Sequence, residues 1–518
     1  MKTFRLIVLS LLTASAWSCG KFLEEYSLNE LRPGTVADLQ QLMIGEAYPV
    51  TSHFAPYLEF LTDDIASNAP TRAIDQSGLL KGEGPYLWRH DMFESMAEQR
   101  LPNSNSYELY YRRVKVCNVV LDYVDRVIGS ADEKAKAKGE ALALRAYYYF
   151  MLVNLHGQPY NAAGVDINTS PGVPLILSST VTDDYPERAS VGAVYACIEQ
   201  DLLEAERLLV ELGKSNSKWR VTDLFVYTLL SRLYLYEEKW EASITYATKV
   251  IQRSPLLVDL CKITNSAGTN FAITNSFTSN VYDINGVETI WVFSNFLEYA
   301  FSINANAMPA YSSTAPAPYA VSPGLLACYD YVDAMAASTK RKDLRPHFYY
   351  FGEGPMTATG RYRTHGLKSI KQGNSDPSKG MRVAESYLNR AEGHARLFLA
   401  TGDEARRAAA LADLNYLRFH RYDRRHEEYT PVDIAAADEL LQFCLDERRR
   451  ELSYEEHRWF DLRRYGMPKI THVFQVTKEQ AAEEYTLEQG DPRYVLPIPA
   501  VALENNPRLT PNPSNTPR

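Results

Sequence analysis

The densest group of chemically capable side chains lies near the C-terminus, in the run ERRRELSYEEHRWFDLRRYG from Glu447 to Gly466. Carboxylates beside His457 are residue types that acid–base catalysis or metal binding would use. However, the charges recur three or four residues apart between large apolar side chains, which is typical of a helix with ion pairs along its surface. His457 has no HExxH partner arrangement. We therefore interpret the run as a scaffold helix rather than a catalytic or metal site.

Two further motifs are relevant to catalysis. Asp63 and Asp64 are adjacent acids, and glycosidic hydrolysis needs only two carboxylates at a suitable separation, so the sequence leaves a hydrolase open. The GEGP stretches at Gly82 and Gly352 continue neither to GKS or GKT nor to GxGxxG, and therefore indicate turns rather than phosphate loops.

The N-terminus predicts export. Lys2 and Arg5 precede an apolar stretch of about 12 residues, whereas a helix that spans a bilayer needs about 20. We therefore predict a removable signal peptide over 1–18. Cleavage before Cys19 would expose the thiol that bacterial lipoproteins acylate with chains such as palmitate, although Ala16 replaces the usual lipobox Leu. An unanchored secreted protein is the alternative.

Composition excludes some classes of protein. The net charge is −9 and no block of basic residues occurs, which disfavours nucleic-acid binding because that depends on clustered Lys and Arg. The cysteines other than Cys19 are widely spaced, odd in number and without a CxxC, so we expect buried thiols rather than a disulfide framework. They are Cys117, Cys197, Cys261, Cys328 and Cys444.

Apolar spacing predicts a mostly α fold. The helices are expected near 107–127, 136–155, 191–212, 222–236, 240–252, 383–400, 403–418 and 435–464. The pair 222–236 and 240–252 has the large, small and aromatic positions of a tetratricopeptide repeat, in which small residues let two antiparallel helices pack closely. A second such pair is expected at 383–400 and 403–418.

The segment 254–380 has no long helical periodicity and is rich in turn-forming residues, so it predicts an irregular, loop-rich subdomain with small strands, such as Thr289 to Phe293. The closing helix would carry its ion pairs at helical spacing. These are Asp446 with Arg449 and Arg450, Glu455 with Arg458, and Asp461 with Arg464.

Taken together, these residues resemble the SusD/RagB family of outer-membrane lipoproteins from Bacteroidetes. The resemblance rests on the Glu447–Gly466 run, on the tail YVLPIPAVALENNPRLTPNP from Tyr494 to Pro513, and on CGKFLEE, YYRRVKVCNVVL and GEALALRAYYYFMLVNLHG. It implies a SusD-like fold with a tether over 19–40, a helical part over 41–253, a ligand-binding subdomain over 254–380 and a C-terminal part over 381–518.

The resemblance also implies a function. Such proteins are non-catalytic, face the cell exterior, and deliver captured glycan, or in some members peptide, to a SusC-like TonB-dependent transporter. No cofactor is implied, and the sequence does not settle whether a structural calcium ion is bound. The two rival functions are a glycan hydrolase and a tetratricopeptide-type adaptor for protein tails.

In this family the glycan site is built from loops of the N-terminal region and of the central segment. A flat aromatic face stacks on a sugar ring while polar groups bond its hydroxyls. The candidates here are Asn68, Arg72, Tyr86, Trp88, Arg89, Tyr282, Trp291, Tyr299, Tyr311 and Tyr319. Trp291 also fits a buried strand, because ETIWVF is apolar, whereas Tyr311 and Tyr319 lie in a Pro/Ala/Ser-rich loop and are expected to be exposed.

Overall fold

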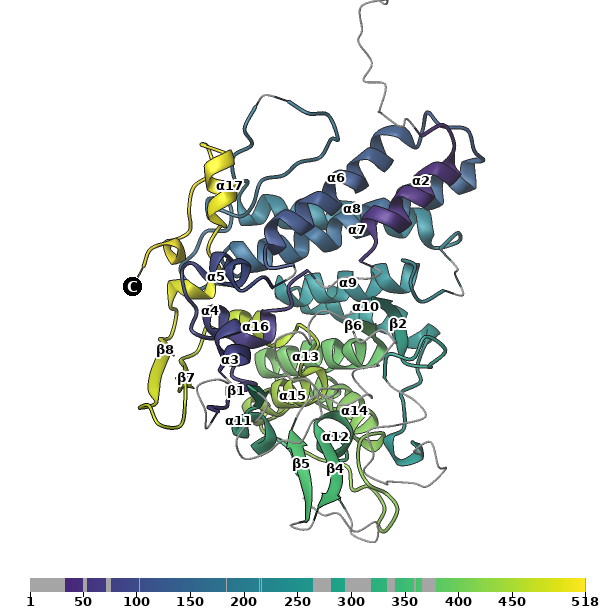
Figure 1. The fold of residues 1–518 in the computed structure, drawn as a ribbon. Coiled ribbons are helices and arrows are strands. Elements are labelled where there is room, and N and C mark those ends of the chain that lie inside the picture. The colour runs from purple at the N-terminus through teal and green to yellow at the C-terminus, as the bar shows by residue number, and fades with distance from the viewer. Residues whose placement is uncertain are drawn as a thin grey trace, which may run out of the picture.

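The computed structural model describes residues 33–49, 54–70, 76–101, 103–182, 184–213, 215, 217–263, 281–293, 318–332, 341–357, 360–365 and 379–517. Helices predominate and lie in layers from α6 at one end of the molecule to α14 toward the other, with small two-stranded sheets among them (Figure 1). This confirms the predicted fold class. None of the described helices is both long and apolar enough to cross a membrane.

Three long helices form the first layer. α6 (Ser106–Tyr123), α7 (Ala131–His156) and α8 (Val191–Leu209) pack against one another in the order predicted. α7 begins at Ala131 rather than near 136, because Ser130 and Glu133 form a capping box in which each side chain accepts the other residue's backbone N–H. The shorter elements of this half are α2 (Val36–Leu42), η2 (Met43–Ala47), η3 (Leu58–Leu61), α3 (Ser77–Lys81), α4 (Glu83–Tyr86) and α5 (Met92–Glu98).

The two tetratricopeptide-like pairs are present and stack on each other. They are α9 (Asp223–Tyr236) with α10 (Trp240–Arg253), and α13 (Val383–Thr401) with α14 (Glu404–Phe419). Within the first pair, Ser231 Oγ donates to the Ser243 carbonyl at 3.0 Å and Ser243 Oγ donates to the Ser231 carbonyl at 2.8 Å. α10 and α13 can pack closely because residue 393 is a glycine. A Cβ atom at this position would lie only 2.8 Å from Ile244 Cγ1 and would clash. The two helix pairs lie far apart in the sequence, so the sequence did not predict that they stack on each other.

The central segment contains the predicted small strands. The antiparallel pairs are β1 (Ile65–Ser67) with β3 (Tyr319–Val321), β2 (Thr289–Phe293) with β6 (Lys379–Arg382), and β4 (Phe351–Thr357) with β5 (Gly360–His365). β4 contains the second GEGP stretch, where a turn was predicted. The remaining described elements here are η5 (Leu260–Lys262), α11 (Pro323–Ala327) and α12 (Arg345–Tyr349).

The closing helix is interrupted, contrary to the prediction of one helix over 435–464. α15 (Ala437–Leu452) stops and α16 (Arg458–Arg464) restarts beyond a turn in which Tyr454 and Glu456 have φ of 60° and 68°, outside the helical region. The chain ends with β7 (Ile470–Phe474) paired to β8 (Glu483–Leu487), followed by η7 (Pro492–Tyr494), α17 (Ala500–Asn505) and η8 (Pro513–Asn515).

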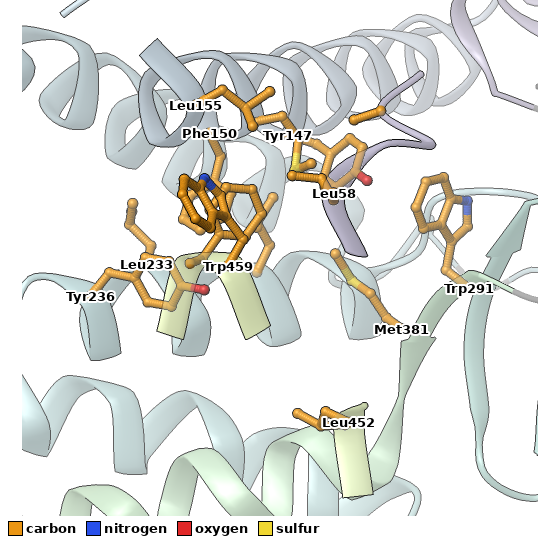
Figure 2. Packing of buried hydrophobic residues seen from close by; sticks show 14 of the residues in the cluster. Leu58, Tyr147, Phe150, Leu155, Leu233, Tyr236, Trp291, Met381, Leu452 and Trp459 are labelled. Carbon is orange, nitrogen blue, oxygen red and sulfur yellow. The ribbon is translucent and has the colours of Figure 1, made fainter. Parts of the chain in front are cut away.

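A single apolar core joins the layers. Figure 2 shows Tyr147 and Phe150 from α7, Trp459 from α16 and Trp291 from β2 within it, and the Trp459 ring stacks on Tyr494 with 5.0 Å between centroids. The five described cysteines are free thiols. Cys117 and Cys444 are buried, as expected, whereas Cys197, Cys261 and Cys328 are partly exposed, so the expectation of burial is wrong for these three.

Buried arginine–carboxylate pairs connect the C-terminal run to the rest of the molecule. Glu451 accepts from Arg421 at 2.9 Å and from Arg382 at 3.0 Å, and Glu447 pairs with Arg345 at 2.7 Å. These side chains are almost completely inaccessible to solvent. The run therefore acts as a scaffold, as predicted, but through contacts with distant segments.

Most of the predicted local ion pairs are consequently absent from the described structure. Only Asp461 with Arg464 forms, at 2.8 Å. Arg449 and Arg458 instead reach Asp63, at 3.0 and 2.8 Å, and Glu455 pairs with Arg382 at 2.8 Å. Helical spacing identifies which charges can meet along one helix, but here tertiary packing brings partners from distant segments instead.

One buried pair predicts how stability responds to acid. Burial opposes ionisation of Glu392, but the charge and hydrogen bonds of Arg464 outweigh it and lower the pKa of Glu392 from 4.5 to about 2. A lowered carboxyl pKa contributes stability above its unfolded value, and this contribution is lost as pH falls from about 4.5 toward 2. The shift corresponds to about 3 kcal/mol.

We therefore expect Glu392→Gln to unfold more easily than wild type at pH 7 and to lose part of the acid dependence between pH 4.5 and 2. Urea unfolding at several pH values measures both effects. Glu404→Gln, which alters an exposed surface pair, is the matched control and should leave the curve unchanged. An unaltered pH dependence in Glu392→Gln would contradict the role of this pair.

Candidate functional site

The two segments expected to build the ligand site meet in one small sheet. Antiparallel β1 and β3 pair Ile65 with Val321 and Ser67 with Tyr319, and the Asn68 N–H, just beyond β1, donates to the Pro318 carbonyl at 2.8 Å. This ladder fixes the N-terminal loop beside the central segment. The structure thus brings together the two regions, although it moves most of the proposed aromatic side chains into the core.

Tyr86 and Trp88 lie beneath this sheet rather than at the surface. Their rings stack on the two faces of His472, with centroids 4.1 Å away in each case. The Trp88 indole N–H donates to the Leu61 carbonyl at 3.0 Å, and the Tyr86 hydroxyl accepts the Ser67 N–H at 3.1 Å. With every polar group satisfied and 3% or less of either side chain exposed, neither ring can stack on a sugar in this conformation.

His472 was missed by the sequence reasoning. It lies on β7, and its two ring nitrogens contact the carbonyls of Tyr86 and Thr62 at 2.7 and 2.9 Å. The segment ITHVF alternates buried and exposed residues, and that period of two was the available signal for a half-buried strand. The His472 side chain lies between the Tyr86 and Trp88 rings and packs with them beneath the β1–β3 sheet.

The other described aromatic candidates are also core residues, which corrects the prediction. Tyr319, expected to be exposed, is buried and donates to the Leu79 carbonyl at 2.6 Å. Tyr282 donates to Glu455 at 2.6 Å. Trp291 packs edge-on against Tyr147 and Phe225, with ring centroids 5.5 and 5.0 Å apart. ETIWVF is therefore a buried strand, which was the alternative interpretation of Trp291.

Two polar candidates keep access to solvent. Asn68 is half-buried at the end of β1. Arg89 is 40% exposed and makes two hydrogen bonds to Asp91, at 2.9 and 2.7 Å. Arg72, Tyr299 and Tyr311 lie outside the described residues, as does the lipidation candidate Cys19.

Asp63 and Asp64, the two acids that could serve a hydrolase, form hydrogen bonds with arginines. Arg458 donates to both oxygens of Asp63 at 2.8 Å, and Arg449 donates to Asp64 at 2.7 Å. Burial opposes ionisation of Asp63, but Arg458 outweighs it and holds the pKa of Asp63 below its usual value. Burial raises the pKa of Asp64, against the opposing charge of Arg449, but its side chain is fully buried. A general acid needs both a raised pKa and access to substrate, and in this conformation neither acid combines the two.

In the described part of the chain, no group of three or more His, Cys, Asp or Glu side chains is arranged to hold a metal ion. The described geometry at β1 and β3 consists of a backbone ladder, polar groups at its edge and a rigid aromatic layer below. Such an arrangement can bind a ligand through hydrogen bonds.

Comparisons with known proteins agree with this description. Residues 21–235 match a family model described as starch-binding and associating with the outer membrane, and residues 353–514 match the SusD family model. Because these related models cover both the N-terminal and the C-terminal part, the chain belongs to the SusD/RagB family, as its motifs indicated.

Individual relatives are distant. SusD-like protein P25 of Formosa agariphila is 24% identical over 277 residues, and the match spans 49% of this chain and about half, 47%, of that relative. A SusD-like carbohydrate-binding protein from Bacteroides vulgatus has a TM-score of 0.63 at 19% identity, covering 94% of this chain and 98% of its own. A laminarin-binding SusD-like protein has a TM-score of 0.56 at 19% identity, covering 92% and 97%.

The burial of Trp88 predicts what its removal does. Trp88→Ala should lower the free energy of unfolding by about 3–5 kcal/mol, because it leaves a cavity beside His472 and an unpaired Leu61 carbonyl. Arg89→Ala, next along the chain but exposed, should change it by about 1 kcal/mol or less. Denaturant unfolding compares the two. Wild-type stability in Trp88→Ala together with lost ligand binding would show that Trp88 contacts ligand directly.

Proposed function

We propose that this protein is a cell-surface lipoprotein that captures oligo- or polysaccharide without cleaving it and delivers it to a SusC-like TonB-dependent transporter. The observation that carries the proposal is the β1–β3 ladder, which holds the two ligand-site segments side by side in a chain of the SusD/RagB family. The carbohydrate-binding and laminarin-binding proteins of the same fold support glycan as the cargo.

Capture would depend on the edge of this sheet. Asn68 offers an amide donor and acceptor to sugar hydroxyls, and Arg72, Tyr299 and Tyr311 remain proposed contributors from the adjoining segments. The aromatic layer of Tyr86, Trp88 and Tyr319 would keep this edge rigid, which lowers the entropy lost on binding. Reversible binding suits a protein that must release its cargo.

The proposed location follows from the N-terminus. Acylation at Cys19 would anchor the protein at the outer membrane, facing the exterior, where several acyl chains give stable attachment. The engagement of Asp63 and Asp64 by arginines supports a non-catalytic role. No cofactor is proposed.

Binding should be weakened selectively by Asn68→Ala. Loss of one or two hydrogen bonds predicts about a two- to tenfold weaker affinity in glycan affinity gels. Asn168→Ala, which alters an exposed asparagine in another loop, is the control. The same incubations should yield no shortened product on chromatography.

Two results would contradict the proposal. Retention of peptides but of no glycan in a ligand panel would identify the peptide-binding alternative. Cleavage of glycan that disappears in Asp63→Asn would identify a hydrolase.

A further inference from the structure

The β7–β8 hairpin lies along the segment that carries Asn68, at the side of the molecule where β1 also lies (Figure 1). Two hydrogen bonds hold it there. Ser67 Oγ donates to the Val473 carbonyl at 2.8 Å. The Lys478 N–H donates to the Pro70 carbonyl at 3.0 Å. An oligosaccharide that binds Asn68 and extends along this segment would therefore reach the hairpin.

The turn of the hairpin carries residue types that bind sugars. Lys478 and Gln480 are exposed and Gln475 is half-buried. The Gln475 amide donates to the Gln480 carbonyl at 2.7 Å, which fixes the amide and directs its donor away from solvent. Its side-chain oxygen can accept from a sugar hydroxyl, and the Lys478 ammonium can donate to one.

Tyr485 adds a ring that solvent can reach. It pairs with His472 across the β7–β8 ladder, so both side chains lie on one face of the hairpin. His472 is buried, whereas Tyr485 packs only partly against the core. The Tyr485 hydroxyl donates to Glu483 at 2.7 Å, and this bond raises the pKa of Tyr485 to about 12. The charge of Arg89 also acts on this hydroxyl, so the ring lies near a polar candidate that solvent reaches.

Core packing accounts for only part of the hairpin. On β7, His472 and Phe474 are buried and face the aromatic layer, but Val473 between them is 49% exposed. The turn is mostly exposed as well. Support of the layer from below therefore requires β7 alone. It leaves the turn and the Tyr485 ring available to a ligand.

We infer that the β7–β8 hairpin is a third wall of the cargo site, beside the two segments that β1 and β3 join. Tyr485 stacks on one sugar ring of a bound oligosaccharide, while Gln475 and Lys478 bond its hydroxyls. The inference rests on the proposed function, because it requires that glycan binds at Asn68. It extends that function by assigning ligand contacts to an element from the C-terminal part of the chain.

Substitutions of Tyr485 test the stacking contact. A glycan panel that includes laminarin and starch is applied to wild type, and the member retained most strongly is the probe. Tyr485→Ala should bind this probe about five- to tenfold more weakly, because the ring face is lost. Tyr485→Phe keeps the ring and should recover most of the affinity. Tyr185→Ala, which removes a half-exposed tyrosine from a distant loop, is the control and should bind as wild type.

Acetylation of the wild-type protein tests the turn without any substitution. Lys478 lies in the turn, and Lys469 lies at the opposite end of the same hairpin, where it is exposed and pairs with Glu488 at 3.1 Å. Acetic anhydride labels both amines, and mass spectrometry measures each. Adding the retained glycan should protect Lys478 and leave Lys469 reactive. Equal labelling of Lys478 with and without that glycan would overturn its assignment to the site.

The outcomes separate this inference from the proposed function. If wild type retains no glycan of the panel, the proposed function fails. If wild type binds and Asn68→Ala weakens binding, but Tyr485→Ala binds as wild type, only the hairpin assignment fails. Urea unfolding of Tyr485→Ala should match wild type within about 1 kcal/mol, because the ring is only partly buried. Weak binding by an unfolded variant would leave the acetylation result to decide.

Discussion

The structure depends on a cluster of fully buried arginines, Arg345, Arg382 and Arg421, that share the carboxylates of Glu447, Glu451 and Glu288. Removing such charges from water costs several kcal/mol for each ion, so the cluster is stable only when every member has its partner. The carboxylates come from α15 and from the residue before β2, and the arginines come from α12, from β6 and from the turn after α14.

This constraint explains how an irregular central region can hold the proposed ligand-site face in place. Arg449 and Arg458 extend the same charge pairing to Asp63 and Asp64, directly before β1. β1 in turn fixes β3 and the start of the loop that carries Asn68. The β1–β3 ladder of the proposed site is therefore positioned by the C-terminal helices, while the aromatic layer around His472 fills the space beneath it.

The sequence predicted the helices well because their apolar periodicity is strong and local, and the bounds of α9, α10, α13 and α14 differ from expectation by a residue or so. It failed where the deciding interaction is long-range. Nothing near Glu455 in the chain indicates that Arg382 will be its partner. Likewise, Tyr86 and Trp88 are residue types that often stack on sugars. They form a core layer here because His472, from β7, packs between them.

The ion pair between Asp63 and Arg458 joins the first third of the chain to the last third. Contacts so far apart form slowly, because a long loop must close before any of them is gained. A nascent polypeptide that emerges N-terminus first therefore cannot pair β1 until β3 has followed, and cannot pair Asp63 with Arg458 until α16 has followed. A chain that ends before Arg449 would leave Asp63 and Asp64 without their arginine partners, and burying these charges unpaired would be costly. Such incomplete products would therefore stay open and be accessible to proteases.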